Sequence, residues 1–131
     1  MSPYHSYPVE VFYEDTDMAG VVFYANYLRY IERARSTMVR ELGVDQGAMK
    51  EQEGLAFVVR KVEADYLSAA KFADQLEVRT QIEAVTGARI QFWQEILRAG
   101  EVIFTARLTV VLINEAGQPA RLPANIRLLL H

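Results

Sequence analysis

The chain has 131 residues, of which 51% are hydrophobic and 24% are charged, and its formal net charge at pH 7 is -3. This balance is typical of a globular chain with a sizeable core, and it excludes a disordered protein and a general nucleic-acid binder, which would need a basic face. The sequence contains no cysteine, which excludes disulfides, thiolate catalysis and a cysteine-ligated zinc site.

The sequence also lacks the marks of a secretory signal or a membrane span. No apolar run follows Met1, and the longest apolar runs are strand-length, far short of the ~20 residues that a membrane helix needs. No repeat or linker divides the chain. We therefore expect a single domain over residues 1–131, located in the cytoplasm.

The first predicted element is a strand from Tyr7 to Glu14, where apolar and polar side chains alternate with a period of two. The next is the only long helix, because apolar side chains recur at helical spacing from Tyr27 to Leu42. Asn26 is a plausible N-cap for this helix, and Gly43 is a plausible stop. The following residues, up to Glu53, predict a short helical turn or a loop.

The rest of the sequence is strand-like, apart from an apolar tail at Ile126–Leu130 that we expect to dock on the domain. The run Ala56–Val59 predicts a strand buried on both faces. The predicted strands are Leu55–Tyr66, Leu76–Glu83, Arg89–Arg98 and Val102–Asn114. Short turns join the last three strands, so they should form an antiparallel meander.

One strand, one long helix and four further strands predict an α+β fold in which the sheet buries one face against the helix. Five long strands present more apolar surface than one helix can cover. We therefore expect a homo-oligomer, either a homodimer or a homotetramer.

The junction between the first strand and the helix is the candidate functional stretch. It contains two acids, Asp15 and Asp17, followed by a small Ala19-Gly20 break. Backbone N–H groups converge at a helix N-terminus with a partial positive charge, which favours an anion or a polarised carbonyl oxygen. Spacing alone leaves Asp17 open between a functional carboxylate and a turn or capping residue. We interpret Asp15 as a turn residue that helps to fix the loop.

The stretch Tyr13–Leu28, which reads YEDTDMAGVVFYANYL, resembles the signature of hotdog-fold acyl-CoA thioesterases when it is taken with Glu32-Arg33-Ala34-Arg35. It is most similar to the 4-hydroxybenzoyl-CoA thioesterase superfamily, especially the bacterial thioesterases associated with the Tol-Pal system. The further matches are Phe57-Val58-Val59-Arg60, Tyr66-x-x-x-Ala70, Asp74-x-Leu76 and Arg121-x-Pro123.

The resemblance implies a hotdog fold, with an antiparallel five-stranded sheet wrapped around one long central helix. It also implies paired subunits with active sites at the dimer interface, a catalytic carboxylate at Asp17, and a thioester-polarising backbone N–H at Tyr24. Many Tol-Pal-type members carry a histidine where this chain has Tyr24, whereas the 4-hydroxybenzoyl type carries a tyrosine there. A mechanism that uses an imidazole at this position is therefore not expected.

Thioester hydrolysis needs an attacking oxygen, stabilisation of the oxyanion and departure of a thiolate. Asp17 could attack directly and form a mixed anhydride, or it could act as general base on water. A thiolate leaves readily, since thiols have pKa values of about 8.5, so the lack of a central histidine is tolerable. His5 and His131, at the chain ends, are not expected to take part.

Substrate contacts are less specific in the sequence. By family position, Phe57, Val58 and Val59 are candidates for an apolar acyl slot, although they could equally be strand core. Three basic residues could meet the phosphates of coenzyme A or could simply be solvated; they are Arg60, Lys61 and Arg89. We expect no metal and no cofactor beyond the coenzyme A of the substrate. The Glu32-Arg33 pair is interpreted as structural.

The sequence thus predicts an acyl-CoA thioesterase acting on a small or medium acyl-CoA, aliphatic or aromatic. Three alternatives stay open at this point. A hotdog dehydratase would act on similar thioesters, but no histidine lies near the junction to move a second proton. An acyl-CoA-binding module would not need Asp17, and an interaction module would not respond to acyl-CoA.

Overall fold

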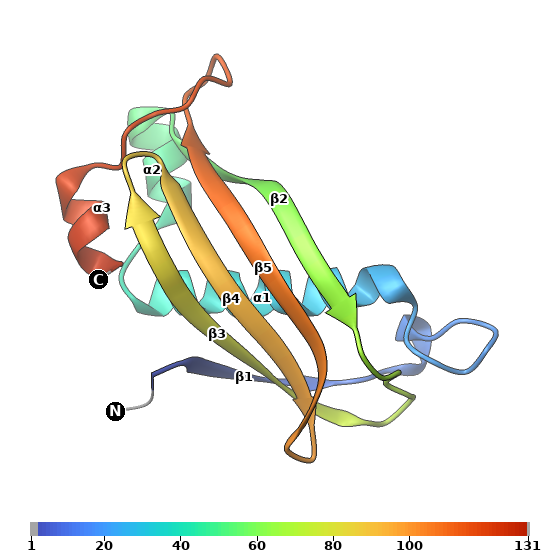
Figure 1. The fold of residues 1–131 in the computed structure, drawn as a ribbon. Helices are drawn as coiled ribbons and strands as arrows, with labels where there is room; N and C mark the ends of the chain where they lie inside the picture. Colours follow the sequence, from blue (N-terminus) through green and yellow to red (C-terminus); the bar gives the residue numbers. More distant parts are fainter. Residues whose placement is uncertain (1–2, 131) are drawn as a thin grey trace.

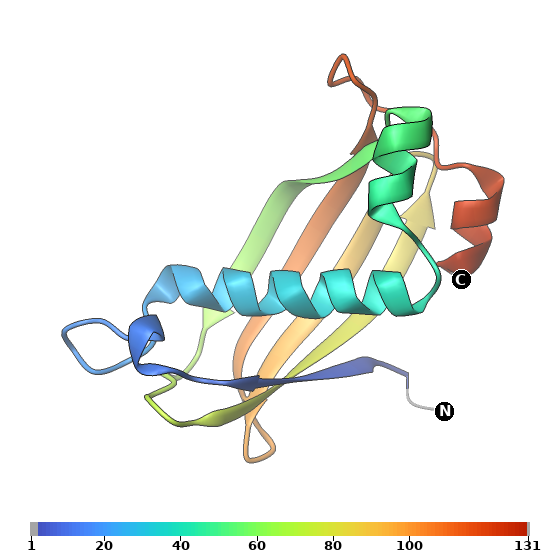
Figure 2. The ribbon, with the colours of Figure 1, turned by 180° about the vertical axis from the view of Figure 1, so that it is seen from behind.

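The computed structural model describes residues 3–130 and contains a five-stranded antiparallel sheet with one long helix lying across one of its faces (Figures 1 and 2). The strand order is β1-β3-β4-β5-β2. The strands are β1 (His5–Glu10), β2 (Ala56–Tyr66), β3 (Gln75–Thr86), β4 (Arg89–Arg98) and β5 (Glu101–Ile113). The helices are η1 (Tyr13–Asp15), α1 (Tyr24–Glu41), α2 (Gln46–Glu53) and α3 (Ala124–Leu129). The predicted α+β class with a five-stranded antiparallel sheet is confirmed.

Strands β3, β4 and β5 form the predicted meander. The turn between β4 and β5 is tight because Ala99 and Gly100 both adopt positive φ, at 50° and 82°, the conformation of a two-residue hairpin turn. Strand β2 returns to the outer side of β5, so β2 and β1 are the two edges of the sheet.

The core lies between α1 and the sheet face that meets it (Figure 2). The buried apolar face of α1 is made by Tyr27, Tyr30, Ile31, Ala34 and Val39. The sheet side chains in the same cluster include Val78, Ile90, Phe92, Phe104, Leu108 and Val110. Each large apolar side chain that is fully buried stabilises the fold by roughly 1.5–3 kcal/mol. The helical periodicity expected from Tyr27 onward therefore reflects core packing, and the apolar tail also docks, because Ile126 and Leu130 are buried.

Three boundaries of the N-terminal elements differ from the sequence prediction, and the first is that β1 begins at His5 instead of Tyr7. Strand β1 ends at Glu10 instead of Glu14, because the chain turns at Phe12 into the 3-10 helix η1. Helix α1 has Phe23 as its N-cap, so Asn26 lies inside the first turn and is buried there. The predicted stop at Gly43 is confirmed by its φ of 103°, a left-handed conformation that favours glycine.

Strand β2 is an edge strand, which corrects the prediction that its first residues are buried on both faces. Phe57 is partly buried, but Val58 and Val59 have 38% and 45% of their surface exposed. The continuous apolar run was misleading because β2 pairs with β5 on one side only. A β-bulge after Val59 inserts Arg60 as an extra residue on this edge.

The sheet face opposite α1 is polar at its centre. The Arg107 guanidinium donates to Glu83 Oε1 over 2.8 Å and lies 5.0 Å from the centre of the Trp93 ring. This hydrogen bond and the Arg107 charge hold the pKa of the Glu83 carboxyl below its usual value. The exposed large apolar side chains lie elsewhere, and one group of them follows β2 and the start of α1.

Within residues 3–130, no helix has both the length and the apolar character that crossing a membrane would require.

Candidate active site at the start of helix α1

Asp17 lies in a small hairpin, residues 16–22, that projects beyond the sheet at the start of α1 (Figure 2). Its backbone closes the turn: Asp17 N–H donates to Val21 O over 2.9 Å, and Gly20 N–H donates to Asp17 O over 3.0 Å. The carboxylate oxygen Oδ1 accepts a hydrogen bond from Ala19 N–H over 2.9 Å. Oδ2 makes no hydrogen bond within residues 3–130, and the side chain is exposed. One oxygen thus fixes the side chain, and the other is available to a substrate or a water.

Both ends of this hairpin are tied together at Asp15. Its carbonyl oxygen accepts hydrogen bonds from Phe23 N–H and from Asn26 Nδ2, each over 2.9 Å. Its carboxylate accepts from Phe12 N–H over 2.9 Å. The interpretation of Asp15 as a residue that fixes the loop is confirmed. The buried Asn26 therefore joins α1 to the hairpin instead of capping the helix, and Arg29 donates to its Oδ1 over 2.7 Å.

Tyr24 is the first residue of α1. A backbone N–H at this position has no acceptor within its own helix, and none is found elsewhere in residues 3–130. The carbonyl oxygen of the same residue accepts a hydrogen bond from the Tyr66 hydroxyl over 3.1 Å. The Tyr24 N–H is therefore a free donor at the positive end of an 18-residue helix.

A recess of about 370 Å³ lies beside this donor. Its lining residues are Val22, Tyr24, Tyr27, Tyr66, Leu67, Ser68 and Ala69. Three aromatic rings meet here, with the Tyr66 centroid 6.3 Å from that of Tyr24 and 5.3 Å from that of Tyr27. Burial, with the neighbouring Tyr24 and Tyr27, raises the pKa of the Tyr66 hydroxyl above its usual value, so this group remains a hydrogen-bond donor at neutral pH.

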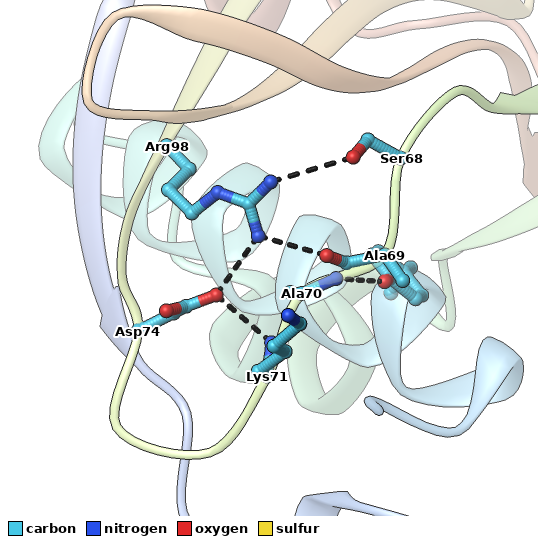
Figure 3. A network of polar contacts seen from close by, with 7 residues as sticks. Ser68, Ala69, Ala70, Lys71, Asp74 and Arg98 are labelled. Atoms are coloured by element: carbon cyan, nitrogen blue, oxygen red, sulfur yellow. Dashed lines mark hydrogen bonds and ion pairs between the residues drawn. The ribbon is translucent and has the colours of Figure 1, made fainter. Parts of the chain in front are cut away.

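The segment from Ser68 to Asp74 supports the hairpin from the other side. Val22 N–H donates to Ala70 O over 2.8 Å, and an isolated bridge joins Val21 to Lys71. Figure 3 shows how Arg98 holds this segment: Nη1 contacts Ala69 O at 2.8 Å and Asp74 Oδ2 at 3.0 Å.

Asp74 also accepts a hydrogen bond from Lys71 N–H over 2.9 Å. Partial burial raises the pKa of the Asp74 carboxyl, but the Lys71 N–H and the Arg98 guanidinium outweigh this effect, so the pKa lies below its usual value. The position of the segment from Ser68 to Asp74, which we call the bracing segment, therefore depends on an ionised Asp74 carboxylate.

Phe57, Val58 and Val59 line a second pocket, of about 180 Å³, between α1 and the sheet. The remaining lining residues are Glu32, Arg35, Ser36, Val39, Gln46, Ile90, Phe92 and Val110. Neither this pocket nor the recess at Tyr24 is lined by Asp17. One chain therefore does not bring the predicted acyl slot and the predicted catalytic carboxylate together.

The three basic candidates are exposed and lie away from the hairpin. Arg60 occupies the bulge in β2, and Lys61 Nζ lies 3.6 Å from Glu63 Oε1. Arg89 begins β4, two strands away from β2. Strands rise about 3.3 Å per residue, so Arg60 is roughly 20 Å along β2 from Tyr66, which contacts Tyr24. A single chain does not gather these residues around the hairpin and Tyr24.

Two positions gain a structural role that the sequence did not indicate. Tyr30 is buried, and burial together with the nearby Asp15 carboxylate raises the pKa of its hydroxyl well above the usual value. The sequence analysis included Arg35 in the Glu32-Arg33-Ala34-Arg35 match but gave it no role of its own. An arginine on the otherwise apolar inner face of a helix was the available signal.

The sequence contains two histidines, His5 and His131. His5 Nε2 lies 3.0 Å from Glu41 Oε2, at the far end of α1 from the hairpin, and His131 lies outside the described residues. Within residues 3–130, no group of three or more His, Asp or Glu side chains is arranged to hold a metal ion. Glu32 accepts a hydrogen bond from Ser36 Oγ over 2.8 Å.

Comparisons with known proteins show which family this chain resembles. The sequence profile of the thioesterase-like superfamily matches residues 11–130. The acyl-CoA thioesterase YbgC of Haemophilus influenzae is 39% identical over 127 residues, which cover 96% of this chain and 93% of that protein. The structure named "Probable Thioesterase" from Bartonella henselae is 37% identical, has a TM-score of 0.87, and is matched over 92% of this chain and 99% of that one.

A variant of 4-hydroxybenzoyl-CoA thioesterase, solved in complex with 4-hydroxybenzoyl-CoA, superposes with a TM-score of 0.91. It is 18% identical, and the match covers 99% of this chain and 100% of that one. At this level of identity, the likeness concerns the fold alone.

Proposed function

The chain belongs to the thioesterase-like superfamily and is a thioesterase, and we propose that it hydrolyses a small or medium acyl-CoA to a free acid and coenzyme A. The observation that carries this proposal is the pairing of Asp17 with a free N–H donor at Tyr24, across a hairpin whose two ends meet at Asp15. We assign the sheet and α1 to the hotdog arrangement.

In the proposed reaction, the thioester carbonyl oxygen accepts a hydrogen bond from Tyr24 N–H, and negative charge develops on that oxygen as the carbonyl carbon is attacked. The attacking atom is either an Asp17 carboxylate oxygen or a water from which Asp17 removes a proton. The C–S bond then breaks and coenzyme A leaves as a thiolate. Where Asp17 is the attacking group, water then hydrolyses the mixed anhydride, which releases the free acid and restores the Asp17 carboxylate. A single oxyanion donor is typically worth about 2.7–4 kcal/mol of the barrier. No cofactor beyond the coenzyme A of the substrate is needed for these steps.

We propose that the site is completed by a second copy of the chain, as a homodimer or a homotetramer. An α-helix rises 1.5 Å per residue, so Arg35 in the acyl pocket lies about 16 Å along α1 from Tyr24. A short acyl group held at Tyr24 therefore does not reach the pocket of the same subunit. The unpaired edge of β2 forms one wall of that pocket through Val58 and Val59, so a partner docked there would bring its own reaction centre closer.

The same arrangement gives the basic residues a role. Arg60, Lys61 and Arg89 are remote from the reaction centre of their own subunit, and we propose that they bind the phosphates of a coenzyme A held by the partner's centre. The Lys61 contact with Glu63 joins two exposed side chains, so it does not prevent Lys61 from moving to a phosphate. Because acyl-CoA substrates are intracellular, a cytoplasmic location is part of this proposal.

The test is thiol release from short-chain, long-chain and aromatic acyl-CoAs by the wild-type protein and by Asp17→Asn. Asparagine keeps an oxygen that can accept the Ala19 N–H bond, so the hairpin should retain its shape while the charge is lost. We expect kcat/KM to fall by at least about 100-fold, the usual scale of general-base catalysis, with the melting temperature unchanged.

Glu14→Gln is the matched control, since it removes an exposed acid from the same stretch and should leave thiol release within about twofold of wild type. Equal activity of the wild-type and Asp17→Asn proteins would refute the role of Asp17. Tight acyl-CoA binding without thiol release from any substrate would instead indicate a binding module.

A further inference from the structure

The pocket between α1 and the sheet contains a charged group that a simple acyl slot does not require. Arg35 lines this pocket beside apolar side chains that include Phe57, Phe92 and Val110. The other polar lining residues are Glu32, Ser36 and Gln46. The Arg35 guanidinium carbon lies 6.0 Å from the centre of the Phe92 ring. This arrangement places a positive charge where an anionic ligand could bind.

The guanidinium is held in a fixed orientation by a buried amide. Gln94 Nε2 donates to Ile31 O over 2.8 Å and to Thr80 Oγ1 over 2.9 Å. Both donor positions of this amide are therefore used, and its Oε1 accepts from Arg35 Nη1 over 3.0 Å. Since Gln94 and Thr80 are fully buried, the network aims Arg35 without neutralising its charge.

No carboxylate in residues 3–130 forms an ion pair with Arg35. Glu32, one turn earlier on α1, is exposed and bonds to Ser36 instead. Burial lowers the pKa of the Arg35 guanidinium below its usual value, and the Glu32 charge only partly opposes this. A half-buried cation without a directly bonded carboxylate is costly to the fold, and an incoming anion would offset part of that cost.

We propose that this pocket binds a carboxylate at the end of a short apolar chain, with Arg35 as the anion anchor. The planar guanidinium retains N–H donors beyond the one that Gln94 accepts, and a fork of donors matches the two oxygens of a carboxylate. The apolar walls cover the chain. A volume of about 180 Å³ limits the ligand to a short or medium chain.

Such a carboxylate has two sources. One is the free acid released by the hydrolysis proposed above, and the other is the far end of an acyl-CoA whose acyl group carries a second carboxylate. Both sources depend on the proposed function, whereas binding of a free acid is measurable without turnover. Given the distance of about 16 Å along α1, a short dicarboxylic thioester would reach Arg35 only from the partner's reaction centre.

The first experiment measures binding of hexanoate and of hexanamide, its neutral counterpart, by calorimetry and by methyl chemical shifts of the pocket residues Val59, Ile90 and Val110. We expect hexanoate to bind at least tenfold more tightly than hexanamide. Arg35→Gln should weaken hexanoate binding at least tenfold and leave hexanamide binding within twofold. Arg33→Gln is the matched control, since it removes the same charge from an exposed position on α1.

Equal affinity of the wild-type protein for the two ligands, or undiminished hexanoate binding by Arg35→Gln, would overturn the proposal. If Arg35→Gln does not fold, the wild-type comparison still decides, and Arg35→Lys tests the fork geometry with the charge retained. Asp17→Asn should bind hexanoate like wild type. Loss of hydrolysis and loss of carboxylate binding are therefore separate results.

The two sources are distinguished by turnover of adipoyl-CoA and hexanoyl-CoA. If Arg35→Gln lowers kcat/KM for adipoyl-CoA but not for hexanoyl-CoA, the ligand is the second carboxylate of the acyl group. If free hexanoate inhibits the wild-type enzyme but not Arg35→Gln, the ligand is the released acid.

Discussion

Asp17 illustrates how a single residue acquires a role from its own backbone. Spacing alone left Asp17 open between a turn residue and a catalytic carboxylate, and the structure shows that it makes the turn: its backbone and Oδ1 hold the hairpin. The turn bonds leave Oδ2 without a partner in residues 3–130. A turn aspartate and a catalytic carboxylate are therefore compatible in the same residue, because different atoms serve the two purposes.

Tyr24→Pro removes the proposed oxyanion donor together with the tyrosine side chain. Proline lacks the N–H, and it is well tolerated at the first position of a helix. The preceding residue, Phe23, already has φ of -61° and ψ of 131°, a conformation that suits a residue before proline. We expect kcat for thiol release to fall about 100- to 1000-fold while the far-ultraviolet circular dichroism stays unchanged.

Tyr24→Ala is the companion variant, since it removes the side chain but keeps the N–H. It should retain far more activity than Tyr24→Pro, with any loss expressed mainly in KM because the recess loses one aromatic wall. If both variants lose the same activity, the side chain and not the amide would be the functional group.

At the scale of elements, the bracing segment from Ser68 to Asp74 determines where the hairpin sits. It contacts the hairpin through backbone bonds to Val21 and Val22 and is itself held by Arg98 (Figure 3). Its position therefore depends on the ionised Asp74 carboxylate, which accepts from both Lys71 and Arg98.

Asp74→Asn should lower the free energy of unfolding at pH 7 by about 1–2 kcal/mol, a moderate value because the ion pair is partly exposed. The folded-state pKa of Asp74 lies below its unfolded value of about 3.9, so the wild-type stabilisation is complete above that pH and is lost as the pH falls through the folded-state pKa. Denaturant unfolding at pH 7 and pH 3 tests this, because the difference between the two proteins should shrink at pH 3.

The exposed Asp65 of β2 forms no ion pair within residues 3–130, so Asp65→Asn should leave stability at pH 7 within about 0.5 kcal/mol. A destabilisation by Asp74→Asn that is the same at both pH values would show that its charge is not the stabilising feature.

The sequence predicted those elements whose signal is local. Periodicity identified α1 and the meander, and the positive φ at Gly43 follows from residue type. It failed where the outcome depends on distant partners. Asn26 was assigned as a cap because its partner, the Asp15 carbonyl, is not encoded in a helix pattern. Val58 and Val59 were assigned to a doubly buried strand because an apolar run does not reveal an edge position.

For the candidate site, the long motif pointed to Asp17 and to the Tyr24 amide, and their catalytic roles stay predictions. The motif did not identify Arg35 as a pocket residue. That role requires Gln94 on β4 and Thr80 on β3, which are far from Arg35 in the sequence. A charge on the inner face of a helix acquires its meaning only from what the sheet places opposite it.

For the whole molecule, the distribution of exposed apolar side chains argues for one particular interface. The exposed apolar residues along β2 and the start of α1 include Phe23, Tyr24, Leu28, Val58, Val59, Val62, Tyr66 and Leu67. The unpaired backbone of β2 lies beside them at the sheet edge. A second copy pairing there would bury these side chains and satisfy the edge, which solvent alone leaves open to aggregation.

The double variant Val59→Lys/Val62→Lys tests this arrangement. Both side chains are on the edge strand, with 45% and 40% of their surface exposed, so the folded monomer accommodates lysine at little cost. Paired β2 edges would place four added positive charges close together in an apolar interface, which is strongly unfavourable. Light scattering after size exclusion should then report a dimer or tetramer for the wild-type protein and a monomer for the variant.

The monomeric variant should also lose most thiol release, both because the acyl pocket and Asp17 are separated within one chain and because Val59 itself lines that pocket. Glu10→Lys, which adds positive charge at the opposite edge in β1, should keep both the assembly and the activity. A variant that is monomeric and fully active would mean that one chain holds a complete site. A variant that stays assembled would place the interface elsewhere, because paired β2 edges could not accommodate the added lysines.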